Sequence, residues 1–176
     1  MAAIFAFTCT CCGKIHEGSP SFAFKAPDHY AGLSEVQKAE MGELSSDFCT
    51  ITHDGQTDYF IRTVLEIPIH GSAEPFTWGI WVSLSKKSFD RYVETYEAPI
   101  EGEGFFGWVC NAIPNYPTGP SSRPADVIVQ SGRQRPKIRL HRSEREDDPL
   151  VLDQYEGISV ARAQWLAEQT MHANEA

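Results

Sequence analysis

Long apolar runs and basic residues are what this sequence lacks most clearly. No stretch approaches the ~20 apolar residues that a membrane-spanning helix needs, which predicts no membrane insertion. Only 15 Lys and Arg stand against 24 Asp and Glu, and the formal net charge is −9. Non-specific binding to nucleic acid or to anionic membranes requires a basic face. The sequence therefore predicts no nucleic-acid and no membrane partner, and it leaves a basic protein partner open.

The sequence also lacks the local patterns of several enzyme classes. It contains no glycine-rich nucleotide loop, no nucleophile elbow and no pair of carboxylates at a telling spacing. No glutamate stands beside a pair of histidines as it does in the helical zinc proteases. We therefore expect a protein without catalysis.

Cysteines are few, and their placement is uneven. Three of the five, Cys9, Cys11 and Cys12, lie within four residues, which is poor geometry for disulfides and suits a reducing compartment. The first residues carry no basic segment followed by an apolar run of the kind found in signal peptides. Both observations predict a cytoplasmic protein.

A C-x₂-C-G motif from Cys9 to Gly13 is the feature that points to specific chemistry. Two thiolates at this spacing are typical of a knuckle that binds one side of a tetrahedral zinc ion. Gly13 permits the positive φ that such a turn needs. We expect His16 and the distant Cys49 to complete a zinc site with Cys9 and Cys12.

Other interpretations of the motif remain open. The thiols can be free and without metal, and His29 and His53 are alternative ligands. Four protein ligands would make the zinc structural, whereas three ligands and a water would allow hydrolysis. Thioredoxin-like enzymes also use C-x₂-C, but there it begins a helix, and residues 14–20 have the composition of a loop. We favour structural zinc.

The hydrophobic pattern predicts an α+β fold, with a mainly antiparallel sheet, a few helices packed on it and the cysteine knuckle at its N-terminal end. The composition, 41% hydrophobic and 22% charged, fits a single globular domain over residues 1–176. The sequence shows no regular β-α-β alternation, and we therefore do not expect a parallel sheet. The expected strands cover residues 4–7, 48–52, 58–69, 76–85, 105–110, 126–130 and 136–142, and the expected helices cover residues 34–42, 88–96 and 159–170.

Two of the expected strands carry candidate ligand-binding residues. Trp81 and Ser83 share a strand face with a glycine, which leaves room for a ligand. Arg62 and Glu66 lie two strand steps apart on one face and could hold a charged ligand. Trp108 adds a further aromatic ring. The alternatives are that Trp81 belongs to the core and that Arg62 and Glu66 form a structural ion pair.

Several short motifs occur in a fixed order along nearly the whole chain. They are Cys9-x₂-Cys12-Gly13 with His16, Ser46-Asp47-x-Cys49, Leu65-Glu66-Ile67-Pro68, Trp78-Gly79-x-Trp81-Val82-Ser83-Leu84, Phe106-Gly107-Trp108, Tyr116-Pro117, Arg135-Pro136 and Gly157-Ile158. In these motifs the chain resembles DUF2199, a family of uncharacterised bacterial proteins. The resemblance implies a single-domain bacterial cytoplasmic protein and no particular activity. Where we expect His-Pro-Leu from the family, this chain has Asp148-Pro149-Leu150.

Together these features predict a zinc-stabilised domain that binds a small ligand or a protein without catalysis. Two alternatives stay open. One is a metal-dependent hydrolase with an open zinc position, and the other is an acidic immunity or antitoxin-type inhibitor of a basic protein.

Overall fold

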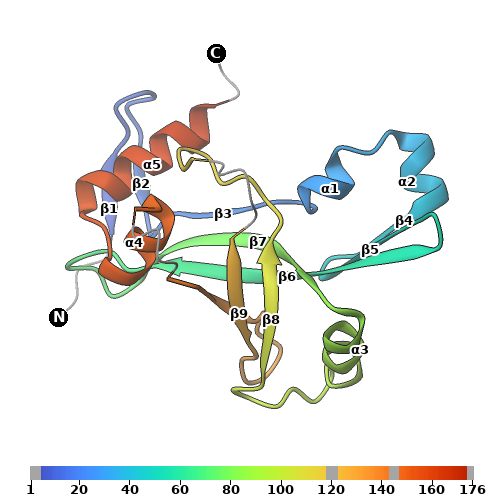
Figure 1. Ribbon diagram of the computed structural model, residues 1–176. Coiled ribbons are helices and arrows are strands. Elements are labelled where there is room, and N and C mark those ends of the chain that lie inside the picture. The colour runs from blue at the N-terminus through green and yellow to red at the C-terminus, as the bar shows by residue number, and fades with distance from the viewer. Residues whose placement is uncertain (1–4, 118–122, 143–146, 174–176) are drawn as a thin grey trace.

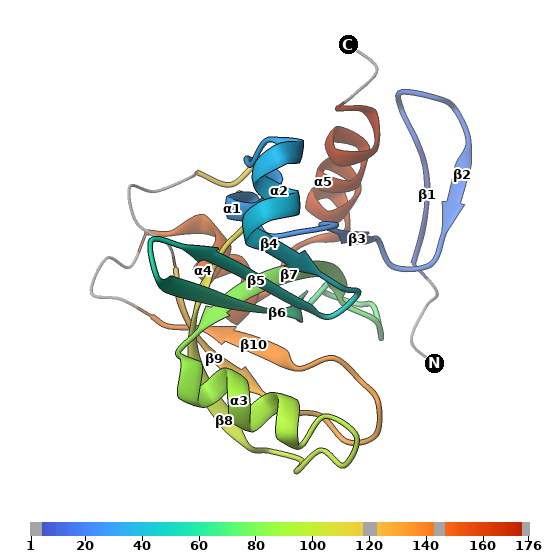
Figure 2. The ribbon, with the colours of Figure 1, turned by 90° about the vertical axis from the view of Figure 1, so that its right-hand side faces the viewer.

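The computed structural model describes residues 5–117, 123–142 and 147–173, and it has the α+β architecture that the sequence predicts (Figure 1). Its centre is a largely antiparallel sheet with the strand order β3-β7-β8-β9-β10-β6-β5-β4. The two longest strands, β6 (Gln56–Ile67) and β7 (Phe76–Leu84), also pair directly. Five strands of the sheet therefore close into a barrel, from which β3, β5 and β4 extend (Figure 2).

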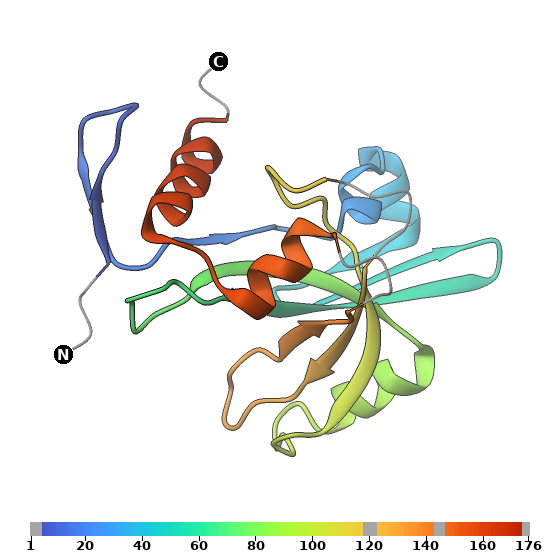
Figure 3. The same ribbon diagram turned by 60° about the vertical axis from the view of Figure 1, so that its left-hand side comes forward.

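Short elements surround these two strands. The other strands of the sheet are β3 (Ser21–Ala23), β4 (Gly42–Leu44), β5 (Phe48–His53), β8 (Gly104–Val109), β9 (Pro124–Ile128) and β10 (Lys137–Leu140), and the helices are α1 (Asp28–Ala31), α2 (Glu35–Met41), α3 (Lys86–Glu94), α4 (Pro149–Glu156) and α5 (Val160–His172). A separate hairpin of β1 (Ala6–Thr8) and β2 (Ile15–Glu17) lies beside α5 (Figure 3). None of the described helices is long and apolar enough to cross a membrane.

The helix starts follow local chemistry. Ser34 begins α2 with a capping box. The Ser34 side chain accepts from the Gln37 N–H, and the Gln37 side chain accepts from the Ser34 N–H. Helix α3 begins earlier than we predicted, because Ser85 rather than Ser88 caps it. Helix α4 was not predicted, although Asp148 caps it and a proline follows directly, which is a common start signal.

The core lies on both faces of β6 and β7. Alternate residues such as Ile61, Leu65, Trp78 and Ile80 are fully buried in the larger cluster, where Leu166 of α5 joins them. The even-numbered residues of β7 therefore belong to the core. Successive side chains of a strand point to opposite faces, so every second side chain lies in the same layer of the core.

The opposite face of these strands holds a second, smaller cluster. It contains Trp81, Cys49 and Phe60, and side chains of the α1–α2 segment, Tyr30 and Leu33, pack against it. Figure 2 shows α1 and α2 above β4 and β5. The odd-numbered face of β7 is therefore covered.

Candidate metal centre

The cysteine motif forms the tight turn between β1 and β2. The Cys9 N–H donates to the Lys14 carbonyl at 2.8 Å, and the Gly13 N–H donates to the Cys9 carbonyl at 2.9 Å. Gly13 has φ of 70°, the left-handed conformation that glycine adopts at little cost. The turn places Cys9 in the core and leaves Cys12 exposed.

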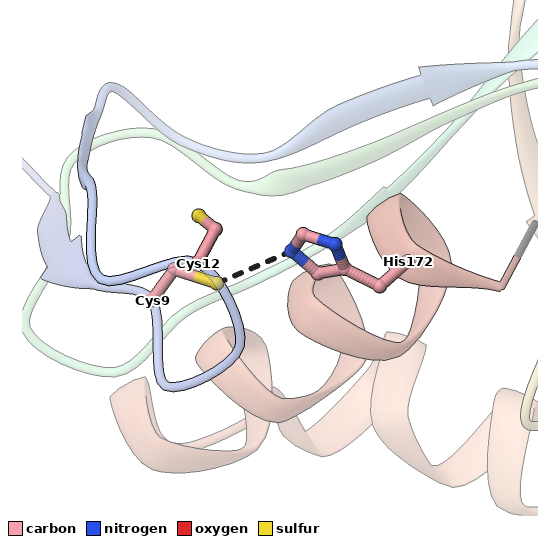
Figure 4. Close-up of side chains that lie close together, drawn as sticks. All are labelled: Cys9, Cys12 and His172. Atoms are coloured by element: carbon pink, nitrogen blue, oxygen red, sulfur yellow. Dashed lines mark hydrogen bonds between the residues drawn. The ribbon is translucent and has the colours of Figure 1, made fainter. Parts of the chain in front are cut away.

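Three possible metal ligands meet at this turn. The Sγ atoms of Cys9 and Cys12 and a ring nitrogen of His172 all lie within 4.8 Å of one another (Figure 4). The Cys9 Sγ lies 3.3 Å from the His172 Nε2. His172 comes from the last turn of α5, so the group joins the two ends of the described chain.

Two other residues of α5 bind the same turn. The Thr10 N–H and hydroxyl donate to the two carboxylate oxygens of Glu168, at 2.7 and 2.8 Å. The Gln164 side chain donates to the Thr8 carbonyl at 3.2 Å. Gln164, Glu168 and His172 are spaced by four residues and so share one helix face. This polar stripe fixes the position of His172 against the knuckle.

The turn also adjusts the acidity of its groups. Burial acts to raise the pKa of Cys9, but N–H groups of Cys12 and Cys11 and the His172 ring outweigh it and lower the pKa to about 6. The Thr10 N–H, helped by Gln164, lowers the pKa of Glu168. A thiol that ionises readily is the form that binds metals.

A family model described as an uncharacterized protein conserved in bacteria, DUF2199, matches residues 8–158. The chain belongs to the DUF2199 family. The matched range includes Cys9 and Cys12 and ends before α5, so His172 lies outside it. Searches among curated proteins and among solved structures find no match.

In this DUF2199 protein the other predicted ligands are placed differently. The His16 Nε2 lies 3.7 Å from the Cys12 Sγ, and the His16 ring stacks on Phe7. Cys49 sits in the second core cluster, where burial, with a contribution from Cys110, raises its pKa to about 12. The structure therefore brings Cys9 and Cys12 together, leaves His16 at the edge of the group and does not bring Cys49 to it.

The two alternative ligands, His29 and His53, also lie away from the knuckle. His53 faces Asp58 at 3.2 Å, and the His29 ring packs against Phe60. Sequence reasoning missed His172, because residue type and short spacing say nothing about a partner more than 150 residues away. The four-residue repeat of Gln164, Glu168 and His172 is the signal that could have revealed it.

The predicted ligand-binding residues do not form one surface. Trp81 is fully buried and its Nε1 donates to the Phe24 carbonyl at 3.2 Å, so core packing, the alternative interpretation, is what the structure shows. Ser83 lies opposite Trp108, whose ring is 43% exposed on the barrel exterior. The space beside Gly79 is filled by β3, not by a ligand.

Arg62 and Glu66 lie on the same face of β6, as predicted, but they do not form an ion pair with each other. Glu66 instead binds the Lys137 ammonium at 2.9 Å, because β10 runs beside β6 at this point. The Arg62 guanidinium donates to the Ser46 carbonyl at 3.4 Å. Burial and the charge of Arg135 lower its pKa, and the charge of Asp47 acts to raise it.

Proposed function

We propose that this protein is a zinc-stabilised binding domain in which Cys9, Cys12 and His172 hold a structural zinc ion. The observation that carries the proposal is the convergence of two thiols and an imidazole from opposite ends of the chain within 4.8 Å. Cysteine and histidine are the ligands that zinc prefers in structural sites. The five free cysteines support the reducing, cytoplasmic location that such a site suits.

The spacing of the ligand atoms supports a tetrahedral ion. Bonds of about 2.3 Å to sulfur and about 2.0 Å to nitrogen place neighbouring ligand atoms roughly 3.5 Å apart. The Cys9–His172 and Cys12–His16 separations, 3.3 and 3.7 Å, are close to this value. His16 is our candidate for the fourth position. Its nitrogen lies outside the group of atoms within 4.8 Å of one another, so its ring would have to turn toward the other ligands to close the site.

The surroundings favour a structural over a hydrolytic role. A hydrolytic zinc needs a water in its fourth position and a nearby group to accept a proton. Glu168 is the carboxylate that contacts this turn, and both of its oxygens already accept hydrogen bonds from Thr10. It therefore serves as an anchor for α5 rather than as a base.

Metal analysis tests the proposal directly. Protein purified without added metal should contain about one zinc per chain. Cys9→Ser, Cys12→Ser and His172→Ala should each lose it, whereas Cys11→Ser should retain it, because Cys11 is an exposed thiol outside the ligand group. Zinc-free wild-type protein, or zinc content unaffected by His172→Ala, would refute the site.

The fourth ligand separates the structural from the hydrolytic interpretation. X-ray absorption at the zinc edge should show two sulfur and two nitrogen neighbours in the wild type. His16→Ala should replace one nitrogen by a water oxygen. A water already present in the wild type would favour the hydrolase instead.

A further inference from the structure

A pocket separate from the metal centre opens between β6, β10 and the end of α3. Its volume is about 480 Å³, within the range of small-molecule sites. Tyr92 and Tyr96 of the α3 segment, Val64 of β6 and Pro99 supply an apolar and aromatic wall, and Arg135 lies on the polar side. The pocket thus combines a ring-sized apolar surface with charged groups.

The charged residues that line this pocket neutralise one another. Besides its ion pair with Arg135, Asp47 accepts a hydrogen bond from the Tyr96 hydroxyl at 3.2 Å, so its carboxylate oxygens already have partners. The ion pairs are Arg135–Asp47 at 2.6 Å, Lys137–Glu66 at 2.9 Å and Arg133–Glu97 at 3.0 Å. Each acid is matched by one base, so the lining alone carries no surplus charge.

Arg62 adds a further positive charge, because Arg62 and Arg135 both face the one carboxylate of Asp47. Arg62 is not part of the lining itself. It lies on the face of β6 that carries the lining residue Val64, and its main-chain N–H donates to the carbonyl of the lining residue Asp47 at 2.9 Å. Its Nε is buried without a hydrogen-bond partner, and among the described residues it forms no ion pair. One carboxylate thus faces two guanidinium groups, and an added anion would balance the second charge.

Tyr92 supplies a second donor. Its side chain is only 6% exposed, and it lines the pocket. Its hydroxyl is not one of the fully buried polar atoms without a partner, so it stays accessible from the pocket. An accessible hydroxyl in a pocket wall can donate a hydrogen bond to a ligand atom.

We propose that this pocket binds a small organic oxyanion, a carboxylate or a phosphate monoester. Its charged group would lie between Arg62 and Arg135 and accept from the Tyr92 hydroxyl. Guanidinium groups suit both anions, because their N–H donors match the geometry of paired oxygens. Its apolar body would lie against Tyr96 and Val64. This site does not depend on the proposed zinc ion.

Isothermal titration calorimetry with three probes tests this inference. Phenylacetate and phenyl phosphate carry the two anions on one aromatic ring, and benzyl alcohol is the neutral counterpart. We expect at least one anion to bind with a Kd below about 1 mM, and benzyl alcohol to bind at least tenfold more weakly. The preferred anion identifies the ligand class. Absence of binding by both anions, or equal binding of benzyl alcohol, would overturn the proposal.

Two variants locate the binding. Arg62→Met should weaken the preferred anion by about tenfold or more and Tyr92→Phe by about fivefold. Tyr59→Phe is the matched control, because Tyr59 also packs on α3 but does not line the pocket, and Arg142→Met removes an exposed guanidinium elsewhere. If Arg62→Met does not fold, Arg62→Gln replaces it. Equal losses in the control variants would place the anion outside this pocket.

Discussion

Glu168 is a buried carboxylate whose main partner lies at the other end of the chain. Both of its oxygens accept from Thr10, and Gln164 donates to one of them at 3.0 Å. Removing its charge weakens bonds that hold the knuckle to α5. We expect Glu168→Gln to lower the free energy of unfolding by about 1–2 kcal/mol, measured by urea denaturation. Glu40→Gln, which makes the same change at an exposed position of α2, should have almost no effect.

The same residue predicts a pH dependence. Its pKa in the folded protein is lowered, chiefly by the Thr10 N–H. The stabilisation is therefore complete above the ordinary pKa of a glutamate and disappears as the pH falls through the lowered folded-state value. Unfolding measured between neutral and acidic pH should show a smaller loss of stability in Glu168→Gln than in the wild type. Parallel curves for the two proteins would contradict this role.

Trp81 and Trp108 differ in burial although both were candidate ligand contacts. Trp81 is fully buried in the second cluster, and Trp108 is 43% exposed. Trp81→Ala should therefore cost about 3–5 kcal/mol in unfolding free energy, because it leaves a cavity. Trp108→Ala should cost less than about 1 kcal/mol. Similar urea midpoints for the two variants would show that Trp81 does not hold the core.

At the scale of elements, Gly79 is what lets β3 join the sheet. A Cβ at this position would lie 2.9 Å from the Ala23 Cβ, closer than side chains tolerate. Gly79→Ala should therefore push β3 away from β7 and lower the unfolding free energy by about 1–3 kcal/mol. Gly104→Ala is the control, since a Cβ there would meet only the Val127 carbonyl, at 3.9 Å. A Gly79→Ala variant as stable as the control would refute the close approach.

Elements with strong local signals were predictable, and those that depend on packing were less so. The turn at Asp54 and Gly55, both with positive φ, and the alternation of β6 follow from a few adjacent residues. The capping box at Ser34 does as well. By contrast, one face of β7 contains both Gly79 and Trp81, and only the docking of β3 and of the α1–α2 segment decides that this face is covered.

At the scale of the whole molecule, the proposed zinc ion would connect the N-terminal hairpin to the C-terminal helix. The hairpin has only two short strands and needs outside contacts to be stable. Stripping the metal with a chelator should lower Tm by roughly 10 °C relative to protein with free zinc a thousandfold above Kd, an effect of about 4 kcal/mol. Differential scanning calorimetry measures this shift.

Hydrogen exchange would show which elements lose stability when the metal is removed. Without metal, amides of β1, β2 and the last turn of α5 should exchange faster, and amides of β6 and β7 should change little. The Cys11→Ser variant should respond to the chelator like the wild type. Uniform acceleration across the barrel would mean that the metal supports the whole fold instead of joining the chain ends.

The sequence by itself determined the features that short segments encode. These are the α+β class, the knuckle of Cys9, Cys12 and Gly13, the helix caps and the alternation of the long strands, because each depends on neighbours a few residues apart. The tertiary structure decided the partners. His172 reaches the knuckle because Glu168 docks α5 onto it, and Glu66 binds Lys137 because β10 lies beside β6. Such contacts join residues far apart in the chain, and only the packing of whole elements selects them.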